Sequence, residues 1–467
     1  MTQGPRVAVI GLDCGTPQLL FRDLAEEVPN IRELMSRGMH GGLASITPPI
    51  TVPAWACAMS GRTPGQLGIY GFRNRKDSTY DGLSIATSDK VTEPQVWDAL
   101  GKRGKKSLLI GVPPGYPPRP LEGWRVSCFL TTPSAKSFAY PAGVQAEVEE
   151  EIGAGNYIFD IPNFREQGFE FVLDQVFRMT ERRFQVARRL VRNKPWDYFM
   201  LVEMGPDRLH HVFWQYYDPT HPKYEPGNKF ERAFQEYYRF LDREVGSLME
   251  TLPEDAITIV MSDHGARPMI GGVCFNDWLV ENGYLTLSEP VTGQTPIGEA
   301  PVDWSRTVAW GDGGYYGRLF LNVKGREPQG IIEQADYANT RDELAAALEA
   351  MSGPDGEPLG TKVLKPEDVY SEVRGVAPDL IVYFGDLEWR SVGTLASSTV
   401  GKFFTYENDT GPDGANHDRT GVFVMAGAPG QPSEQVDGLQ LVDVGPTILS
   451  LYGIEAPSGA VGRSFLS

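Results

Sequence analysis

The chain has 467 residues, of which 41% are hydrophobic, and its formal net charge is −18. This length and composition indicate a globular protein with a large buried core. The negative charge argues against a nucleic-acid polymer or an anionic membrane as a partner, because both require excess Lys and Arg. An anionic substrate would therefore need a local positive centre.

The N-terminus and the cysteines predict the compartment. Residues 1–5 lead directly into the apolar run at 7–10, which leaves no room for a signal peptide. No apolar run approaches the roughly 20 residues that span a bilayer. The cysteines lack paired spacing, which suits reduced thiols. We therefore expect a soluble, cytoplasmic protein, and we leave its oligomeric state open. The four cysteines are Cys14, Cys57, Cys128 and Cys274.

The first part of the chain alternates between strand and helix patterns. Residues 7–12 form a continuous apolar run, typical of a parallel strand buried on both faces, and Asp13 stands at its carboxyl end. Residues 47–55 contain three prolines, which predicts a stiff loop presenting Thr51 instead of a helix interior. Another strand is predicted at 106–112. The alternation predicts an α/β fold with a doubly wound, mainly parallel sheet.

Two later segments break this alternation. We predict that residues 132–195 and 268–316 are insertions that form a cap, and that the whole chain, 1–467, is one domain. Within the first insertion, residues 168–192 have the apolar stripe of a long amphipathic helix. The sheet resumes with a strand at 198–202.

Polar side chains follow several of these strands. The apolar run at 257–261 is followed closely by Asp263 and His264. Asp207 comes soon after the strand at 198–202, much as Asp13 follows the first strand. In open α/β sheets, ligands bind outside the carboxyl ends of the strands. These side chains are therefore candidates for one shared site.

Histidines complete a candidate metal-binding set. His211 follows Asp207 by four residues, so the two share one face of a helical turn. His417 lies just before the last strong strand, at 421–426, whereas His210 is expected to point away. Imidazole nitrogen and carboxylate oxygen are the ligands that zinc takes, and catalytic zinc sites usually keep one position open. The pattern predicts a metal site.

These motifs, taken together and in this order, resemble the alkaline phosphatase superfamily and, within it, the type I phosphodiesterase/nucleotide pyrophosphatase branch. The resemblance covers the whole chain and implies an alkaline phosphatase-like α/β fold. The motifs are Gly11–Gly15, Thr51–Trp55, Ser60–Pro64, Gly68–Ile69, Pro206–His211, Ser262–Gly265, His417 and Asp443–Thr447.

The resemblance also implies a site with two divalent ions, expected to be zinc, although an O/N ligand set also accepts manganese or iron. It assigns Asp13, Asp263, His264 and the nucleophile Thr51 to one ion. It assigns Asp207, His211 and His417 to the other. Two such ions can clamp the attacking and leaving oxygens of an in-line displacement, and a threonine hydroxyl needs this activation. We expect a phosphoric ester hydrolase with a covalent phosphothreonine intermediate.

The substrate-binding residues are less clearly defined. Nucleotide pyrophosphatases similar to this chain carry an Asn after the nucleophile motif that binds a phosphate oxygen, but here the corresponding position is Phe72. Either Asn74 replaces that Asn after a shift of two residues, or Arg73 supplies a charged donor. Arg73 would favour a monoester, because a guanidinium pairs best with its doubly charged phosphate. An apolar Phe72 would instead suit the uncharged or aromatic substituent of an ester. We predict a small-molecule phosphate ester substrate, with diesters preferred over monoesters.

Several alternatives use the same core. A phosphomonoesterase or a phosphonate hydrolase would need the same metals. A phospho-group transferase would normally carry a membrane anchor. A sulfatase is disfavoured because no Cys-x-Pro-x-Arg signature surrounds Thr51. A binding protein that has lost catalysis is disfavoured because every ligand type and the nucleophile are present.

Overall fold

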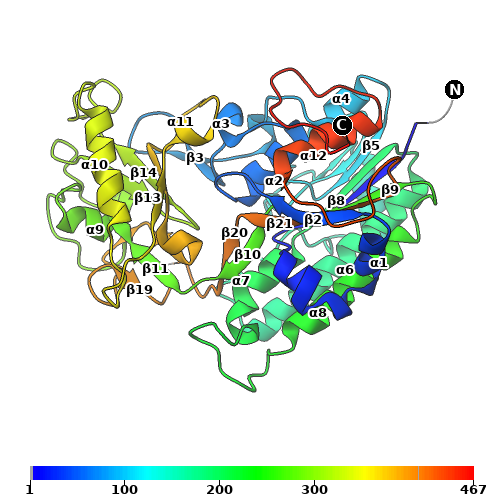
Figure 1. The fold of residues 1–467 in the computed structure, drawn as a ribbon, viewed down its shortest axis with the longest axis horizontal. Helices are drawn as coiled ribbons and strands as arrows, with labels where there is room; N and C mark the ends of the chain where they lie inside the picture. Colours follow the sequence, from blue (N-terminus) through cyan, green and yellow to red (C-terminus); the bar gives the residue numbers. More distant parts are fainter. Residues whose placement is uncertain (1–3, 409, 467) are drawn as a thin grey trace.

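The computed structural model describes residues 4–408 and 410–466, and a nine-stranded sheet forms its centre (Figure 1). The strand order is β22-β2-β21-β9-β1-β8-β5-β6-β7. The strands are β1 (Val7–Leu12), β2 (Met39–Ala44), β5 (Ser107–Ile110), β6 (Gly123–Val126), β7 (Ala139–Tyr140), β8 (Tyr198–Glu203), β9 (Ile257–Met261), β21 (Thr420–Ala426) and β22 (Leu439–Gln440).

The middle of this sheet is parallel. Strands β9, β1, β8, β5 and β6 all run in one direction. The pairs β21–β9, β21–β2 and β6–β7 are antiparallel and flank the parallel strands. The prediction of an α/β fold with a mainly parallel sheet is therefore confirmed. Every residue of β1 is buried, which explains why that strand is a continuous apolar run.

Helices cover both faces of the sheet (Figure 1). Ala8, Ile10 and Leu12 of β1 pack into one core cluster, and Val7 and Val9 pack into the other, because successive side chains point to opposite faces. The first cluster includes residues of α1 (Pro29–Ser36), α5 (Gly143–Ile152), α6 (Phe169–Asn193), α7 (Gly205–Tyr217) and α8 (Ala233–Met249). The second includes residues of α2 (Thr51–Ser60), α4 (Val96–Gly101) and α12 (Val444–Leu451).

A smaller lobe lies beside the central sheet and has its own apolar core (Figure 1). Its four-stranded antiparallel sheet has the order β13-β14-β16-β15, and a second sheet has the order β17-β11-β19. The lobe contains β11 (Gly271–Cys274), α9 (Phe275–Glu281), β12 (Thr295–Pro296), β13 (Ala309–Asp312), β14 (Gly317–Leu321), α10 (Tyr337–Glu349), β15 (Lys362–Leu364), α11 (Pro366–Val369), β16 (Leu380–Tyr383), β17 (Trp389–Val392), β18 (Thr394–Leu395) and β19 (Phe404–Thr405).

Short elements connect the two parts. The hairpin of β3 (Arg73–Arg75) and β4 (Leu83–Ile85) follows α3 (Pro64–Leu67), and β10 (Gly265–Pro268) pairs with β20 (Ala415–Asp418). Short helical turns lie at Gln18–Asp23, Ala25–Glu27, Ser88–Lys90, Ile297–Glu299, Phe384–Leu387 and Leu441–Asp443.

The two segments predicted as cap insertions lie in different parts of the molecule. Residues 132–195 contain β7, α5 and α6, and both helices pack on the central sheet. Residues 268–316 supply β11, α9 and β13 to the smaller lobe, which also takes in residues well beyond 316. The division of the chain into one domain with these two cap insertions stays a prediction.

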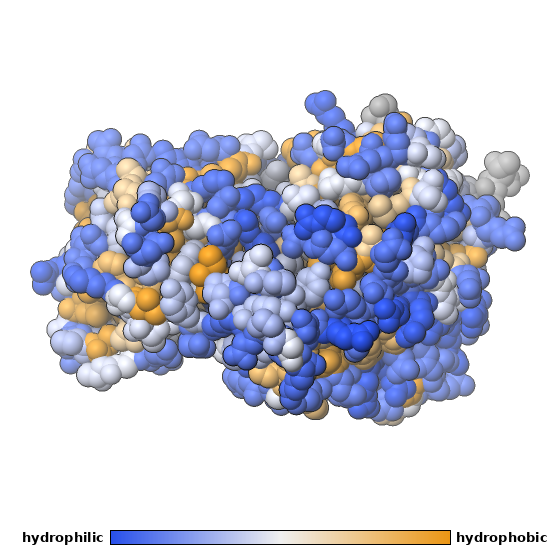
Figure 2. Space-filling model, turned by 60° about the horizontal axis from the view of Figure 1, so that its bottom comes forward, coloured by the Kyte–Doolittle hydropathy of each residue, from blue (hydrophilic) through white to orange (hydrophobic). Residues whose placement is uncertain are grey.

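The predicted amphipathic helix at 168–192 is α6, Phe169–Asn193, and that prediction is confirmed. Its buried residues include Val172, Val176 and Leu190, while its charged residues mostly face outward. Among the described residues, no helix combines the length and apolar character needed to cross a membrane. The face of the molecule drawn in Figure 2 is mostly hydrophilic, with apolar groups scattered between polar ones.

Candidate metal centre and active site

Three carboxylates meet where the parallel strands β9, β1 and β8 end. Asp13 directly follows β1, and its backbone N–H donates to the carbonyl of Glu203 at the end of β8, 2.9 Å away. Asp263 follows β9 by two residues. Asp207 lies in the first turn of α7, which begins soon after β8. Neighbouring parallel strands end at the same edge, so three sequence-distant carboxylates converge.

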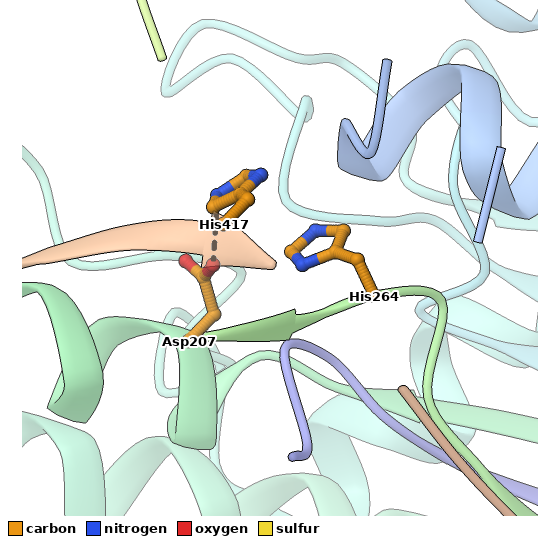
Figure 3. Close-up of side chains that lie close together, drawn as sticks. All are labelled: Asp207, His264 and His417. Carbon is orange, nitrogen blue, oxygen red and sulfur yellow. Dashed lines mark ion pairs between the residues drawn. The ribbon is translucent and has the colours of Figure 1, made fainter. Parts of the chain in front are cut away.

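Three histidines join these carboxylates. His264 follows Asp263 and precedes β10, which pairs with β20 so that Ala266 lies opposite His417. The Nε2 atoms of His211 and His417 lie 3.3 Å and 3.7 Å from Oδ1 of Asp207. Figure 3 shows the carboxylate of Asp207 directed toward the ring of His417, with His264 beside it. The structure thus brings all six predicted carboxylate and imidazole ligands together.

The ligand atoms form two overlapping clusters. One cluster contains Asp13, Asp263 and His264, and the other contains Asp207, His264 and His417. Within each, the ligand atoms lie within 4.8 Å of one another, and all of these residues are buried. Nε2 of His211 adjoins the second cluster, 3.3 Å from Nε2 of His417 and 3.3 Å from Oδ1 of Asp207.

The carboxylate oxygens of this cluster that have no hydrogen-bond partner fit divalent cations. Oδ1 of Asp13, Oδ1 of Asp207 and Oδ2 of Asp263 are buried and accept no hydrogen bond from any described residue. A buried carboxylate oxygen without a partner costs about 1–3 kcal/mol or more. Three such oxygens directed into one centre, beside imidazole nitrogens, match the donor set of zinc and similar ions.

The histidines are oriented with Nε2 toward the centre. Nδ1 of His211 lies 2.9 Å from Oδ1 of Asp413, and Nδ1 of His264 and of His417 lie 3.1 and 2.8 Å from backbone carbonyls. A carbonyl or carboxylate only accepts, so each Nδ1 carries the proton and donates it. The Nε2 lone pairs of His264 and His417 are then available to a metal, the usual arrangement around metal-binding histidines, and that of His211 becomes available when a metal displaces its second proton.

The electrostatics of the two clusters differ. Burial lowers the pKa of His264 to about 4 and holds the pKa of His417 well below its usual range. Burial also disfavours a charged His211, but the carboxylates of Asp413 and Asp207 outweigh it and raise its pKa to about 9. Burial would raise the pKa of Asp207, yet His211 and Arg208 hold it well below the usual value. Asp207 is therefore ionised.

No cation outweighs the effect of burial at the other two carboxylates. Burial raises the pKa of Asp13 well above its usual value, and the charge of Asp207 raises it further. Burial and the charge of Asp13 likewise raise the pKa of Asp263. A metal must displace protons from these groups, so its binding here is coupled to proton release.

Thr51 is the first residue of α2, which corrects the prediction of a proline-rich loop over residues 47–55. Only residues 47–50 are non-helical, because Pro53 lies in the first turn, where its missing N–H disrupts no intrahelical bond. Oγ1 of Thr51 lies 3.2 Å from Nε2 of His264, and the residue is 1% exposed. The hydroxyl therefore lies inside the ligand cluster, at the positive end of a helix.

A cavity of about 520 Å³ opens beside this centre. Ile50, which precedes Thr51, lines it, as do Tyr315 and Tyr316. The ring of Tyr315 stacks on His211 and His417, with centroids 4.9 and 4.2 Å apart. The cavity thus adjoins the candidate metal centre, separated from it by residues that contact the ligands.

The three candidate substrate-binding residues lie in different surroundings. Phe72 and Arg73 line the cavity, and the Arg73 side chain is exposed. Asn74 lines a separate cavity and its amide closes a turn: Oδ1 accepts from the N–H of Tyr70 at 2.8 Å, and Nδ2 donates to the carbonyl of Gly71 at 2.9 Å.

Several neighbours of the ligands were not predicted from the sequence. The indole N–H of Trp55 donates to Oδ2 of Asp13 at 2.7 Å. Trp55 belongs to the Thr51–Trp55 motif, so its position near the site could have been predicted. Arg208 donates to Asp207 from within the Pro206–His211 motif. Asp413 and Arg165 had no signal of their own, because neither follows a strand nor lies in a motif.

Comparisons with known proteins identify the family of the chain. The family model described as type I phosphodiesterase/nucleotide pyrophosphatase matches residues 7–413, which include every candidate ligand except His417. No curated protein sequence matches the chain.

Solved structures show the same fold. Human ectonucleotide pyrophosphatase/phosphodiesterase 5 is 14% identical, with a TM-score of 0.55 over 97% of this chain and 96% of that one. The murine protein is 12% identical over the same shares of the two chains, with a TM-score of 0.54. Its inactive threonine-to-alanine variant, in complex with AMP, is also 12% identical over these shares, with a TM-score of 0.55. With the family model covering most of its length, the chain belongs to the type I phosphodiesterase/nucleotide pyrophosphatase family and is a phosphoric ester hydrolase.

Proposed function

We propose that the protein hydrolyses small phosphate diesters, using two divalent ions and Thr51 as the nucleophile. The observation that carries this proposal is the convergence of three unpartnered, buried carboxylate oxygens on the hydroxyl of Thr51 and three imidazole Nε2 atoms. A purely structural cluster of this kind would leave the oxygens unsatisfied, which is costly, and would not need a hydroxyl among them.

The residues divide between the two ions as the family resemblance implies. Asp13, Asp263, His264 and the hydroxyl of Thr51 would hold one ion. Asp207, His211 and His417 would hold the other. When bound, two ions supply Lewis-acid stabilisation of the attacking and leaving oxygens. Zinc is the expected ion because the donors are oxygen and imidazole nitrogen, and manganese or iron are the alternatives.

Thr51 performs the covalent step. Its Oγ1 attacks phosphorus, a bond forms between Oγ1 and phosphorus, and the bond from phosphorus to the leaving oxygen breaks. Water then attacks the phosphothreonine ester and releases Thr51. Because Thr51 begins α2, the helix directs its positive end toward the phosphate and favours the added negative charge. The murine relative, whose threonine-to-alanine variant is described as inactive, supports this role by analogy.

The cavity beside Thr51 is the proposed substrate site. Its volume, about 520 Å³, is in the range of small-molecule sites. Phe72, Tyr315 and Tyr316 give it aromatic walls, which suit an apolar or aromatic ester substituent. These walls favour a diester, which carries one negative charge at phosphorus and two substituents. The AMP complex of the murine relative supports a substrate of nucleotide size.

A phosphomonoesterase or phosphonate hydrolase is the second candidate, because Arg73 also lines the cavity. A guanidinium stabilises the doubly charged phosphate of a monoester more than it stabilises the singly charged phosphate of a diester. A phospho-group transferase differs from both only in using an alcohol instead of water as the second acceptor.

A hydrolysis screen tests the proposal. The metal-loaded protein is assayed with aryl monoesters, aryl diesters, nucleotides and nucleotide sugars, with and without EDTA. We expect metal-dependent hydrolysis with aryl diesters among the better substrates. Hydrolysis of monoesters alone would replace the diester assignment, and turnover unaffected by EDTA would contradict the two-ion site.

The location proposed for the protein is the cytoplasm. All four cysteines are buried and none forms a disulfide, as is usual in a reducing compartment.

A further inference from the structure

A short segment between α5 and α6 contacts the neighbours of two candidate metal ligands. This segment runs from Asp160 to Arg165, and we call it the ligand clamp. Nε and Nη2 of Arg165 donate to Oδ2 of Asp413 at 2.9 and 2.7 Å. Oδ1 of the same carboxylate accepts from Nδ1 of His211 at 2.9 Å. Arg165 is thus one residue removed from a metal ligand, and the side chain of Asp413 between them is fully buried.

The other end of the clamp contacts a second ligand in a similar way. Oδ1 and Oδ2 of Asp160 accept from Nε and Nη2 of Arg208, both at 2.7 Å. Nη1 of Arg208 donates to Oδ2 of Asp207. Because Oδ2 of Asp207 is held by this guanidinium, only Oδ1, which has no hydrogen-bond partner among the described residues, faces the metal centre.

Phe164, within the clamp, packs against two of the guanidinium groups that make these contacts. The guanidinium carbons of Arg165 and Arg208 lie 4.4 and 4.8 Å from the ring centroid of Phe164, within the range of cation–π contacts. Nη2 of Arg165 also donates to the hydroxyl of Tyr315, whose ring stacks on His211. The clamp therefore contacts its targets as one unit.

The other half of the metal centre is held differently. Asp13 accepts from the indole of Trp55 at 2.7 Å, and Asp263 accepts from the backbone N–H of Cys14 at 3.2 Å. Both donors are neutral. Asp207 instead accepts from a guanidinium, so its bond joins two opposite charges, which makes it one of the stronger kinds of hydrogen bond. The surroundings of the two ions are therefore unequal.

We propose that the ligand clamp positions Asp207 and His211 and thereby sets the affinity of their half-site for its ion, with little effect on the half-site of Asp13 and Asp263. The inference rests on the proposed function, since it requires that both half-sites bind ions. A carboxylate that accepts from a metal-binding histidine fixes the orientation of the ring and raises its basicity. Arg165 acts on His211 in this way through Asp413, so it is a positioning residue.

The test compares Arg165→Met with Arg189→Met. Arg189 is a matched control because it also pairs with carboxylates, those of Glu150 and Glu151, and has similar exposure, but it lies on α6 and contacts no candidate ligand. Each metal-depleted protein is titrated with Zn²⁺ against a chromophoric chelator, which yields a dissociation constant for each ion. Arg165→Met should raise one of the two constants roughly 10- to 100-fold and leave the other unchanged. Arg189→Met should change neither.

Further variants separate positioning from a general loss of structure. Asp413→Asn keeps an oxygen that accepts from His211, so it should weaken the same ion less than Asp413→Ala does. In the Asp413→Ala background, Arg165→Met should add much less than it does in the wild type, because Asp413 carries most of the contact between Arg165 and His211 and only the bond to Tyr315 remains. The two Asp413 single variants still test the clamp if Arg165→Met does not fold.

Three results would overturn the inference. If the wild type binds two ions and both dissociation constants are unchanged in Arg165→Met and Asp413→Ala, the clamp does not set the metal affinity. The proposed function would be unaffected by that result. Equal weakening of both ions would show that the segment supports the fold only. A wild-type protein that binds no Zn²⁺ would refute the proposed function, and the clamp with it.

Discussion

The hydroxyl of Thr51 and Nε2 of His264 lie 3.2 Å apart, so the first residue of α2 meets the residue that precedes β10. Both side chains are almost completely buried. A threonine hydroxyl is a weak nucleophile unless a neighbouring group or ion favours its alkoxide. This contact places the hydroxyl where Asp13 and Asp263 also direct unpartnered oxygens.

Replacing Thr51 should separate catalysis from metal binding. We expect Thr51→Ala to lose activity on the order of 10³-fold or more while keeping both ions nearly filled, since removal of a nucleophile abolishes the covalent route. Thr51→Ser retains a hydroxyl and should remain partly active. The measurements are kcat/KM and metal content for each variant. Turnover near the wild-type value in Thr51→Ala would show that water attacks phosphorus directly.

Metal content should be two divalent ions per chain, and chelation should abolish activity, because the proposed reaction needs both ions to stabilise the attacking and leaving oxygens. His417→Ala should weaken one ion more than the other, since Nε2 of His417 lies 3.7 Å from Oδ1 of Asp207 and 3.3 Å from Nε2 of His211. Elemental analysis of purified protein and of this variant measures both effects. No stoichiometric transition metal, together with activity that survives EDTA, would rule out the site.

Arg73 should distinguish monoesters from diesters. Its exposed side chain lines the cavity, and a charge-assisted bond to a doubly charged phosphate is worth about 1.5–3 kcal/mol. We expect Arg73→Ala to lower kcat/KM about tenfold or more for an aryl monoester and less for the matching alkyl aryl diester, which should remain the better substrate in the wild type.

Asn74→Ala is the companion variant for that experiment. The amide of Asn74 bonds to the backbone of its own turn, so the variant should affect both esters alike. A wild-type preference for the monoester that collapses in Arg73→Ala would move the assignment to a phosphatase.

His210 should make the fold sensitive to acid. Burial lowers its pKa to about 3, and its Nε2 lies 2.7 Å from the hydroxyl of Tyr238. In the unfolded chain a histidine takes up a proton below pH of about 6.5. Because the unfolded state then binds one more proton than the folded state, stability falls as the pH drops from about 6.5 toward about 3. The contribution is up to about 1.4 kcal/mol per pH unit.

Urea unfolding of the metal-depleted protein at several pH values tests this. His210→Gln should show a shallower decline of the unfolding free energy over the same window, because it removes one titrating group. The other buried histidines contribute equally to both proteins, so the difference between the two slopes reports on His210. Identical slopes would refute the assignment.

Much of the fold follows from short apolar runs in the sequence. The strands β1 and β9 are continuous apolar segments that end close to Asp13 and Asp263, so their place in a parallel sheet and the edge where the carboxylates meet were both predictable. The four-residue spacing of Asp207 and His211 likewise predicted a shared helix face.

Other features could not be predicted from local pattern. The three prolines at 47–55 argued against a helix, but a proline in the first turn does not interrupt one, and α2 begins at Thr51. Arg165 and Asp413 are 248 residues apart in the chain, and each lies outside any strand or periodic helix. Their contact depends on how the loop between α5 and α6 meets the segment before β20, which no local propensity determines.

The most direct test of the central claim is the stereochemical course at phosphorus. A phosphorothioate diester of known configuration is hydrolysed in oxygen-18 water, and the configuration of the product is determined. Each in-line displacement inverts the configuration, so attack by Thr51 followed by attack of water predicts net retention. Net inversion would mean a single displacement by water and would contradict a covalent phosphothreonine intermediate.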